Sequence, residues 1–235
     1  MAVLKPGEAE ILARDMHFIW LVDCSGSMQV DGKMAQLNNA IKEAIPDMRK
    51  VEAENPFAKI LVRAIKFSNG AAWHISQAIP VAEFTWTDLE ADGVTDMGAA
   101  FAKLAEQLTV DKMGNRGFPP VLVLITDGMP TDDWKKGLKQ LMEQPWGKRA
   151  TRIAIAIGRD ADHEPLKAFV GNIERPILQA NNPQDLVNYI QWASAAVSKS
   201  VIAPPSKTTD GSTAEPEADA LAAPPPPVGD DEEVW

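Results

Sequence analysis

Residues 17–28 read HFIWLVDCSGSM, an apolar run that passes directly into a loop of small, oxygen-bearing side chains. The run His17–Val22 is continuous rather than alternating, which is typical of a β-strand covered on both faces of a sheet. Ser68-Asn69-Gly70 is a hairpin signal, so we expect the run that follows it to be an antiparallel edge strand. The further strand candidates are Ile60–Phe67, Ala72–Ile75, Val121–Ile125, Arg152–Ile157 and Ile177–Gln179.

Between these runs, apolar residues recur at helical spacing. One stripe contains Pro46, which should kink the helix or restart it. Asn181 or Asn182 is available to cap the last helix. The stripes are Met34, Leu37, Ile41, Ile45 and Met48; Met97, Phe101, Leu104 and Leu108; and Leu186, Ile190, Ala193 and Val197, with shorter helices over Asp132–Glu143 and Pro165–Val170. Strands that alternate with helices form right-handed crossovers. We therefore predict an α/β fold with a doubly wound, Rossmann-like, mostly parallel six-stranded sheet, one antiparallel edge strand and helices on both faces.

Three polar loops stand next to these elements. Asp23-Cys24-Ser25-Gly26-Ser27 follows the first strand, Thr126-Asp127-Gly128 follows the Val121–Ile125 strand, and Gly93-Val94-Thr95-Asp96-Met97-Gly98 opens a helix. In a doubly wound sheet, ligands bind outside the carboxyl ends of the strands where the strand order reverses. The first and fourth strands usually flank that point, so we expect the first and third loops to meet there.

The side chains of these loops suit a hard divalent cation. Ser25, Ser27 and Thr95 offer neutral hydroxyls, while Asp23 and Asp127 offer two negative charges. Each residue alone is also an ordinary turn or cap residue, but their combination in three loops favours a metal site. Few carboxylates and several hydroxyls favour Mg²⁺, with Mn²⁺ and Ca²⁺ as alternatives. Such a site leaves a position open for a carboxylate from a partner protein, which is a binding device rather than a catalytic one.

Together the loops resemble the metal-ion-dependent adhesion site of von Willebrand factor type A (VWA) domains. The resemblance covers roughly Asp15 to Ser200 and implies that Asp23, Ser25, Ser27, Thr95 and Asp127 are the metal ligands. Three segments are also similar to the corresponding segments of the bacterial tellurium-resistance TerY-type VWA proteins: DCSGSM (23–28), GVTDMGAA (93–100) and LITDGMPTD (124–132). That similarity implies a stress-response or signalling assembly with a protein kinase and a PP2C-like phosphatase as partners.

Composition excludes several other classes of protein. The formal net charge of −10 argues against nucleic acid as the main partner, and the single cysteine, Cys24, rules out an internal disulfide. No apolar run is long enough to span a bilayer, and Met1–Asp15 lacks the apolar core of a signal peptide, so we expect a cytoplasmic protein with no membrane contact. No nucleophile–base pair or phosphate-binding loop occurs, so we expect neither enzymatic activity nor a small-molecule substrate.

The predicted organisation is an N-terminal extension over residues 1–14, a VWA domain over 15–202 and a disordered tail over 203–235. The tail is acidic and holds seven of the 18 prolines, a composition that does not support a packed core. Two alternatives to the adaptor function remain open. One is a regulated scaffold whose phosphorylatable tail carries partner binding, and the other is a metal-dependent hydrolase with Asp96 as its base. A tail carboxylate from Glu232, Glu233 or the Trp235 terminus could also occupy the metal.

Tryptophan is unusually frequent, with seven residues. Trp20 and Trp192 fall in regular elements, and we expect both in the core. The other four within the predicted domain lie on the predicted edge strand or near loops, where they suit either an interface or packing against a neighbouring helix: Trp73, Trp86, Trp134 and Trp146.

Overall fold

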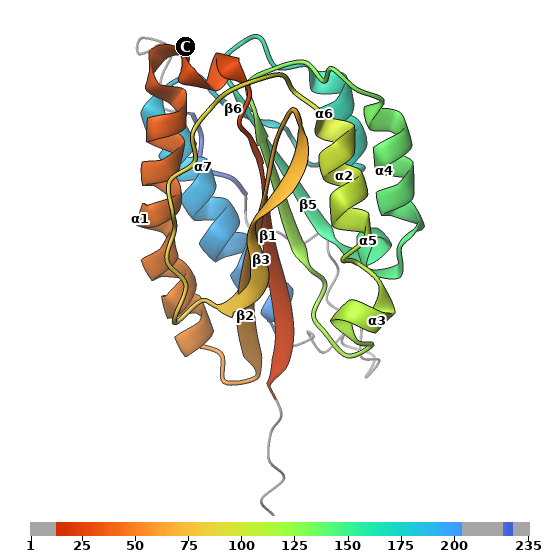
Figure 1. Cartoon of the computed structure of the whole chain (residues 1–235). Helices are drawn as coiled ribbons and strands as arrows, with labels where there is room; N and C mark the ends of the chain where they lie inside the picture. The colour runs from red at the N-terminus through yellow and green to blue at the C-terminus, as the bar shows by residue number, and fades with distance from the viewer. Residues whose placement is uncertain (1–12, 204–222, 228–235) are drawn as a thin grey trace, which may run out of the picture.

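Six strands form one sheet in the order β3-β2-β1-β4-β5-β6 (Figure 1). This computed structural model describes residues 13–203 and 223–227. The strands are β1 (Arg14–Asp23), β2 (Ala58–Ser68), β3 (Gly70–Pro80), β4 (Val121–Thr126), β5 (Thr151–Ile157) and β6 (Leu178–Ala180). β3 runs antiparallel to β2, and the other neighbouring pairs are parallel. The predicted doubly wound sheet with its antiparallel edge strand is therefore confirmed.

The central strands are apolar on both faces because helices cover both faces. In β1, Phe18 and Trp20 join the core beneath α1 (Lys33–Ala53) and α7 (Pro183–Trp192). The alternating residues Ile19 and Leu21 join a second core, beneath α2 (Met97–Ala105), α4 (Trp134–Glu143) and α6 (His163–Val170). Figure 1 shows α1 and α7 on one side of the sheet and α2 and α4 on the other. This two-sided burial explains the continuous apolar runs in the sequence.

Short elements complete the chain between the main layers. They are a 3-10 helix, η1 (Gly26–Gly32), the helices α3 (Val110–Met113), α5 (Pro145–Arg149) and α8 (Ser198–Ile202), and a π-helical turn, η2 (Ala193–Val197), that joins α7 to α8. Side-chain caps fix where several helices begin: Asn182 accepts from Asp185 N at 2.9 Å and Asp133 accepts from Lys136 N at 3.1 Å. The sequence offered Asn181 or Asn182 as the cap of the last helix, and the structure shows that Asn182 is the cap.

Several details of local structure differ from the expectations. Of the kink or restart expected at Pro46, the restart does not occur, because α1 runs through Pro46 as one 21-residue helix. α2 ends at Ala105, so Leu108 of its predicted stripe lies beyond the helix, although its side chain is still buried. Trp192 is only half-buried at the end of α7, because it packs against the margin of the core rather than inside it.

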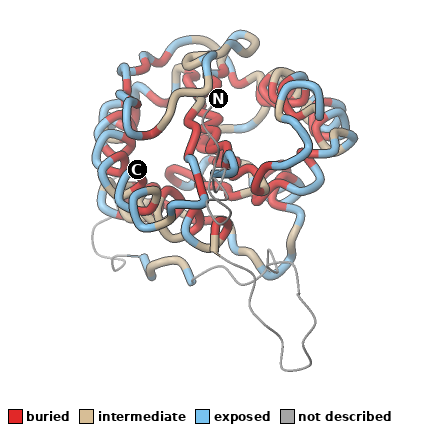
Figure 2. Tube along the Cα trace, turned by 90° about the horizontal axis from the view of Figure 1, so that it is seen from below, coloured by how far each residue is buried: buried red, intermediate tan, exposed pale blue. Residues whose placement is uncertain are grey.

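Figure 2 shows buried residues gathered at the centre of the molecule and exposed residues around its outline. Within the described residues, no helix is both long and apolar enough to cross a membrane. Most of the predicted N-terminal extension and most of the predicted tail fall outside the described residues, so these two predictions are untested.

Candidate metal site

β1 and β4 lie side by side, and their polar loops leave the sheet at the same end. Val22 of β1 stands opposite Ile125 of β4, so Asp23 and Thr126 end neighbouring strands. Asp127 follows Thr126 and reaches Ser27 across 100 positions of sequence. The structure therefore brings the first and third loops together at the carboxyl edge of the sheet, where the strand order reverses.

Asp23 lies at the bottom of the site and is fully buried. One carboxylate oxygen accepts from the backbone N–H of Ser25 at 2.8 Å, and the other accepts from the hydroxyl of Thr126. Burial raises the pKa of Asp23 from 3.8 to about 6; the hydrogen bonds from Thr126 and Ser25 oppose this rise, and the nearby charge of Asp127 adds to it. The protein groups around Asp23 thus stabilise its charge poorly.

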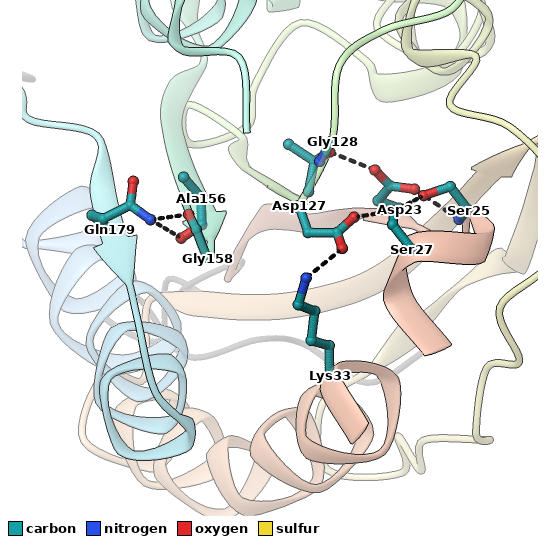
Figure 3. Close-up of polar contacts among 10 residues, drawn as sticks. Asp23, Ser25, Ser27, Lys33, Asp127, Gly128, Ala156, Gly158 and Gln179 are labelled. Atoms are coloured by element: carbon teal, nitrogen blue, oxygen red, sulfur yellow. Dashed lines mark hydrogen bonds and ion pairs between the residues drawn. The ribbon is translucent and has the colours of Figure 1, made fainter. Parts of the chain in front are cut away.

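Two serines and Asp127 form a chain of hydrogen bonds from the interior to the surface (Figure 3). The Ser27 hydroxyl donates to Asp127 Oδ1 at 2.7 Å. Ser25 Oγ lies 3.0 Å from Ser27 Oγ, and because the Ser27 proton is already used, Ser25 is the donor of this bond. Ser25 and Asp127 are buried, whereas Ser27 is exposed. The hydrogen-bonded chain therefore runs from the buried carboxylate of Asp127 to the exposed residue Ser27.

Thr95 enters the cluster from the second loop. The backbone of that loop is tied to the first, since Gly26 N–H donates to Gly93 O at 3.0 Å. It is also tied to the third, since Thr131 N–H donates to Thr95 O at 2.9 Å. A methyl group on the Gly128 α-carbon would lie 3.4 Å from Thr95 Oγ1 and 3.8 Å from Ser27 Oγ, so both hydroxyls flank Gly128. All five predicted ligand residues are thereby brought into one cluster.

Lys33 is the residue that sequence reasoning missed. Its ammonium lies 2.9 Å from Asp127 Oδ2, and both side chains are nearly inaccessible to solvent, at 9% and 0% exposure. Lys33 is the first residue of α1, where the helix dipole disfavours a positive charge. A lysine at this unfavourable position, shortly after the polar loop, therefore indicates in the sequence that a nearby carboxylate pairs with it.

Asp96 and Asp132 lie near the site but hold the loops in place. Asp96 accepts from the backbone N–H of Gly70 at 2.7 Å and from the Thr131 hydroxyl at 2.8 Å. Asp132 accepts from two backbone N–H groups at the start of α2, those of Gly98 and Ala99, at 2.8 Å each. Both carboxylates thus stabilise loop geometry, and Asp132 links α2 to the loop before α4.

Cys24 takes no part in the cluster. Its side chain is buried and its thiol donates to the carbonyl of Val22 at 3.7 Å. Burial raises the pKa of the thiol to about 12, and the charge of Asp23 adds to that rise. The thiol is therefore protonated and does not supply the thiolate that metal binding or nucleophilic attack would need.

The donor set fits a hard divalent cation. It offers two carboxylates and three hydroxyls, and these oxygen donors suit Mg²⁺, Mn²⁺ or Ca²⁺. Among the described residues, no group of three or more His, Cys, Asp or Glu side chains could hold a metal ion. The buried Asp23 charge gains most from a bound cation. The ion pair of Asp127 with Lys33 means that one of the two carboxylates is already partly compensated.

The sheet, its crossovers and the clustered loops define a Rossmann-like domain with a polar site at the topological switch point. The von Willebrand factor type A domain model matches residues 18–192, and the chain belongs to this family. No curated protein sequence matches the chain significantly.

Solved structures share the fold at low sequence identity. A von Willebrand factor type A protein from Catenulispora acidiphila is 19% identical with a TM-score of 0.60, covering 78% of this chain and 42% of that one. The ArnB paralog VWA2 from Sulfolobus acidocaldarius is 18% identical with a TM-score of 0.53, covering 77% and 45%. Proximal thread matrix protein 1 from the mussel byssus, with a zinc-occupied MIDAS motif, is 17% identical with a TM-score of 0.58, covering 78% and 49%. The chain thus spans less than half the length of each, and the likeness concerns the fold alone.

Proposed function

We propose that this chain is a metal-dependent protein-interaction module in which Asp23, Ser25, Ser27, Thr95 and Asp127 hold a divalent cation, Mg²⁺ by preference, that binds a carboxylate of a partner protein. VWA domains commonly serve as metal-dependent adhesion and interaction modules, and one structural neighbour holds zinc at such a motif. The observation that carries the proposal is the hydrogen bond from exposed Ser27 to buried Asp127, which connects a buried charge to the surface.

Charge balance favours an acidic ligand. Two carboxylates and the Lys33 ammonium leave the cluster with one net negative charge. A bound divalent cation would convert this to an excess of one positive charge in a poorly hydrated site, where an anion gains more than it would in water. An aspartate or glutamate of a partner supplies that anion.

The surroundings of the site add apolar contacts. Val30, Val94 and Met129 are exposed large hydrophobic side chains, 53%, 44% and 66% exposed. Val94 stands in the second loop, Met129 directly follows the third, and Val30 lies in η1 just after the first. Apolar side chains beside a charged centre are typical of the middle of a protein interface. The partner carboxylate is accordingly expected to be flanked by apolar residues as well as by the basic residues that the exposed acids Asp31 and Asp92 would attract.

A binding role accounts for the acidic residues better than catalysis does. Asp96 was the candidate base of a hydrolase, but both of its oxygens accept hydrogen bonds from loop groups, Gly70 N–H and the Thr131 hydroxyl. A general base needs an oxygen directed at the substrate. We therefore propose that the chain is not an enzyme. Phosphatase or nuclease turnover in Mg²⁺ or Mn²⁺ that disappears in Ser27→Ala would overturn this.

Membership of a TerY-like assembly with a kinase and a PP2C-like phosphatase is a proposal that rests on the three loop segments. A cytoplasmic location is a separate proposal. The phosphorylatable tail of the alternative scaffold function lies outside the described residues, at Ser206, Thr208, Thr209, Ser212 and Thr213.

The test joins metal binding to partner capture. Isothermal titration with MgCl₂, MnCl₂ and CaCl₂ measures the metal, and pull-down in Mg²⁺ or EDTA followed by mass spectrometry measures the partner. Ser27→Ala should weaken both, whereas Ser76→Ala, which removes an exposed hydroxyl from β3, should change neither. Met129→Ser should weaken capture but leave metal affinity unchanged. Equal capture of the same partner in Mg²⁺ and in EDTA would refute the proposal.

A further inference from the structure

The second edge of the sheet has an apolar hollow beside β6. β6 pairs only with the last three residues of β5, Ile155 to Ile157. Within the described residues, the first half of β5 therefore has a strand neighbour on the β4 side alone. A cavity of about 270 Å³ lies at this step, and its apolar wall includes Ile153, Leu178 and Trp192. A short edge strand beside a longer one thus creates a groove between the sheet and the end of α7.

A distant segment of the same chain lines this groove. Ala223 and Pro224 contribute to the wall of the cavity, opposite residues of β5, β6 and α7. Pro224 and Pro225 are half-buried, whereas Ala223, Pro226 and Pro227 are exposed. In Figure 2 the segment is the short coloured length of tube between two grey stretches. The burial pattern shows which end of the proline run contacts the domain.

The chemistry of the groove suits proline. Four consecutive prolines have a fixed φ and favour an extended polyproline II helix, so they lose little conformational entropy on binding. Such helices bind in grooves lined by aromatic side chains. Trp192 provides the aromatic wall of the groove.

Charge and chain length favour the same contact. Arg152 and Arg175 place two positive charges at the groove and Glu174 one negative charge, and the acidic run Asp230 to Glu233 follows the prolines in sequence. About 20 residues connect Ala203 to Ala223, so the proline segment is tethered to the domain within one chain. Tethering through a short linker gives an effective concentration of about millimolar order. An affinity far too weak to hold a free peptide is sufficient for a tethered one.

We propose that the groove beside β6 is a binding site for proline-rich polypeptide and that segment Ala223–Pro227 of the same chain occupies it. The site lies on a different loop set from the metal cluster, and its lining includes none of the five predicted metal ligands. The proposal therefore stands apart from the metal-dependent function and is tested in EDTA.

The test follows the indole signal of Trp192 by ¹H–¹⁵N NMR of the full chain, with Trp192→Phe to assign it among the seven tryptophans. The double variant Pro224→Ser, Pro225→Ser replaces the half-buried prolines and should shift the Trp192 signal. The matched control Pro226→Ser, Pro227→Ser replaces the exposed ones and should shift it much less. Unchanged signals from the other tryptophans show that the variants are folded.

A peptide with the sequence of residues 223–228 then tests the groove from outside. It should move the Trp192 signal of the Pro224→Ser, Pro225→Ser chain back toward its wild-type position. It should bind that variant several-fold more tightly than the wild-type chain, in which the tethered segment competes. A Trp192 signal that is identical in the wild type and this variant would overturn occupation by the segment. A peptide that moves no Trp192 signal at millimolar concentration would overturn the site itself.

Discussion

Replacing Asp23 with asparagine should stabilise the metal-free fold at neutral pH, although it removes a carboxylate of the candidate metal site. Burial raises the pKa of Asp23 from 3.8 to about 6. Each pKa unit corresponds to about 1.4 kcal/mol, so keeping this group ionised above pH 6 costs the folded state about 3 kcal/mol. Asparagine retains an acceptor for the Ser25 N–H but disturbs the bond from the Thr126 hydroxyl, a loss of about 1 kcal/mol. The expected net gain is about 2 kcal/mol.

The sign of the pH dependence follows from proton counts. Between about pH 4 and pH 6, the folded wild type retains a proton on Asp23 that the unfolded chain has released. The contribution of Asp23 to the free energy of unfolding of the metal-free wild type therefore falls as pH rises through this window. Above the window, the cost of keeping Asp23 ionised is constant. The asparagine variant lacks this contribution, so its advantage over the wild type should be full at pH 7.5 and should shrink at pH 4.5.

Urea and thermal unfolding in EDTA measure the effect. A gain of about 2 kcal/mol should raise the melting temperature by about 4–8 °C for a chain of this size. Glu83→Gln, which neutralises an exposed carboxylate, is the control and should change little. Added Mg²⁺ should stabilise the wild type and the control but not Asp23→Asn. If Asp23→Asn were less stable than the wild type in EDTA at pH 7.5, the reasoning that burial makes this charge costly would be refuted.

Three further predictions concern residues around the cluster. Lys33→Met leaves buried Asp127 without its ammonium partner, so it should destabilise the metal-free chain by about 3 kcal/mol. The same change should tighten Mg²⁺ binding in a calorimetric titration, and an unchanged metal affinity would contradict this. Burial lowers the pKa of His17 from 6.5 to about 4, so stability should fall by up to about 3 kcal/mol as pH drops through that range, and His17→Gln should remove the loss in acid unfolding curves. Gly93 has φ +88° and faces Asn69, so Gly93→Ala should cost about 1–3 kcal/mol in urea unfolding; a smaller cost would mean that the loop adapts.

The sheet could be predicted because its residues follow strong local rules. Continuous apolar runs identified the strands, and the Ser68-Asn69-Gly70 turn identified the antiparallel edge. Helix details were less predictable because tertiary packing overrides local preference. Pro46 is tolerated inside α1, where Ile45 and Met48 bury the same face of the helix on both sides of it.

The candidate site could be predicted as a set of residues but not as an arrangement. The loop residues could be identified from their side-chain types and from their positions after strands or at the start of a helix. The contacts between them depend on side-chain reach across the sheet, which no local pattern encodes. Lys33 shows this most clearly, since only the folded chain places its ammonium beside Asp127. Trp192 shows the converse: it lies in a regular element, as expected, but at the last residue of α7, where it is only half-buried.

The adjacency of β1 and β4 has a consequence for how this protein is made. Asp23 is synthesised early, yet its partner strand ends only at Thr126, and the two strands pair directly. A nascent chain that has folded only its first hairpin, β2–β3, therefore lacks Thr95 and Asp127, two of the five predicted ligands. Contacts between segments so far apart in sequence form late and slowly. Cation uptake should consequently coincide with the final docking of the central strands, so a time-resolved metal signal during refolding would report completion of the sheet.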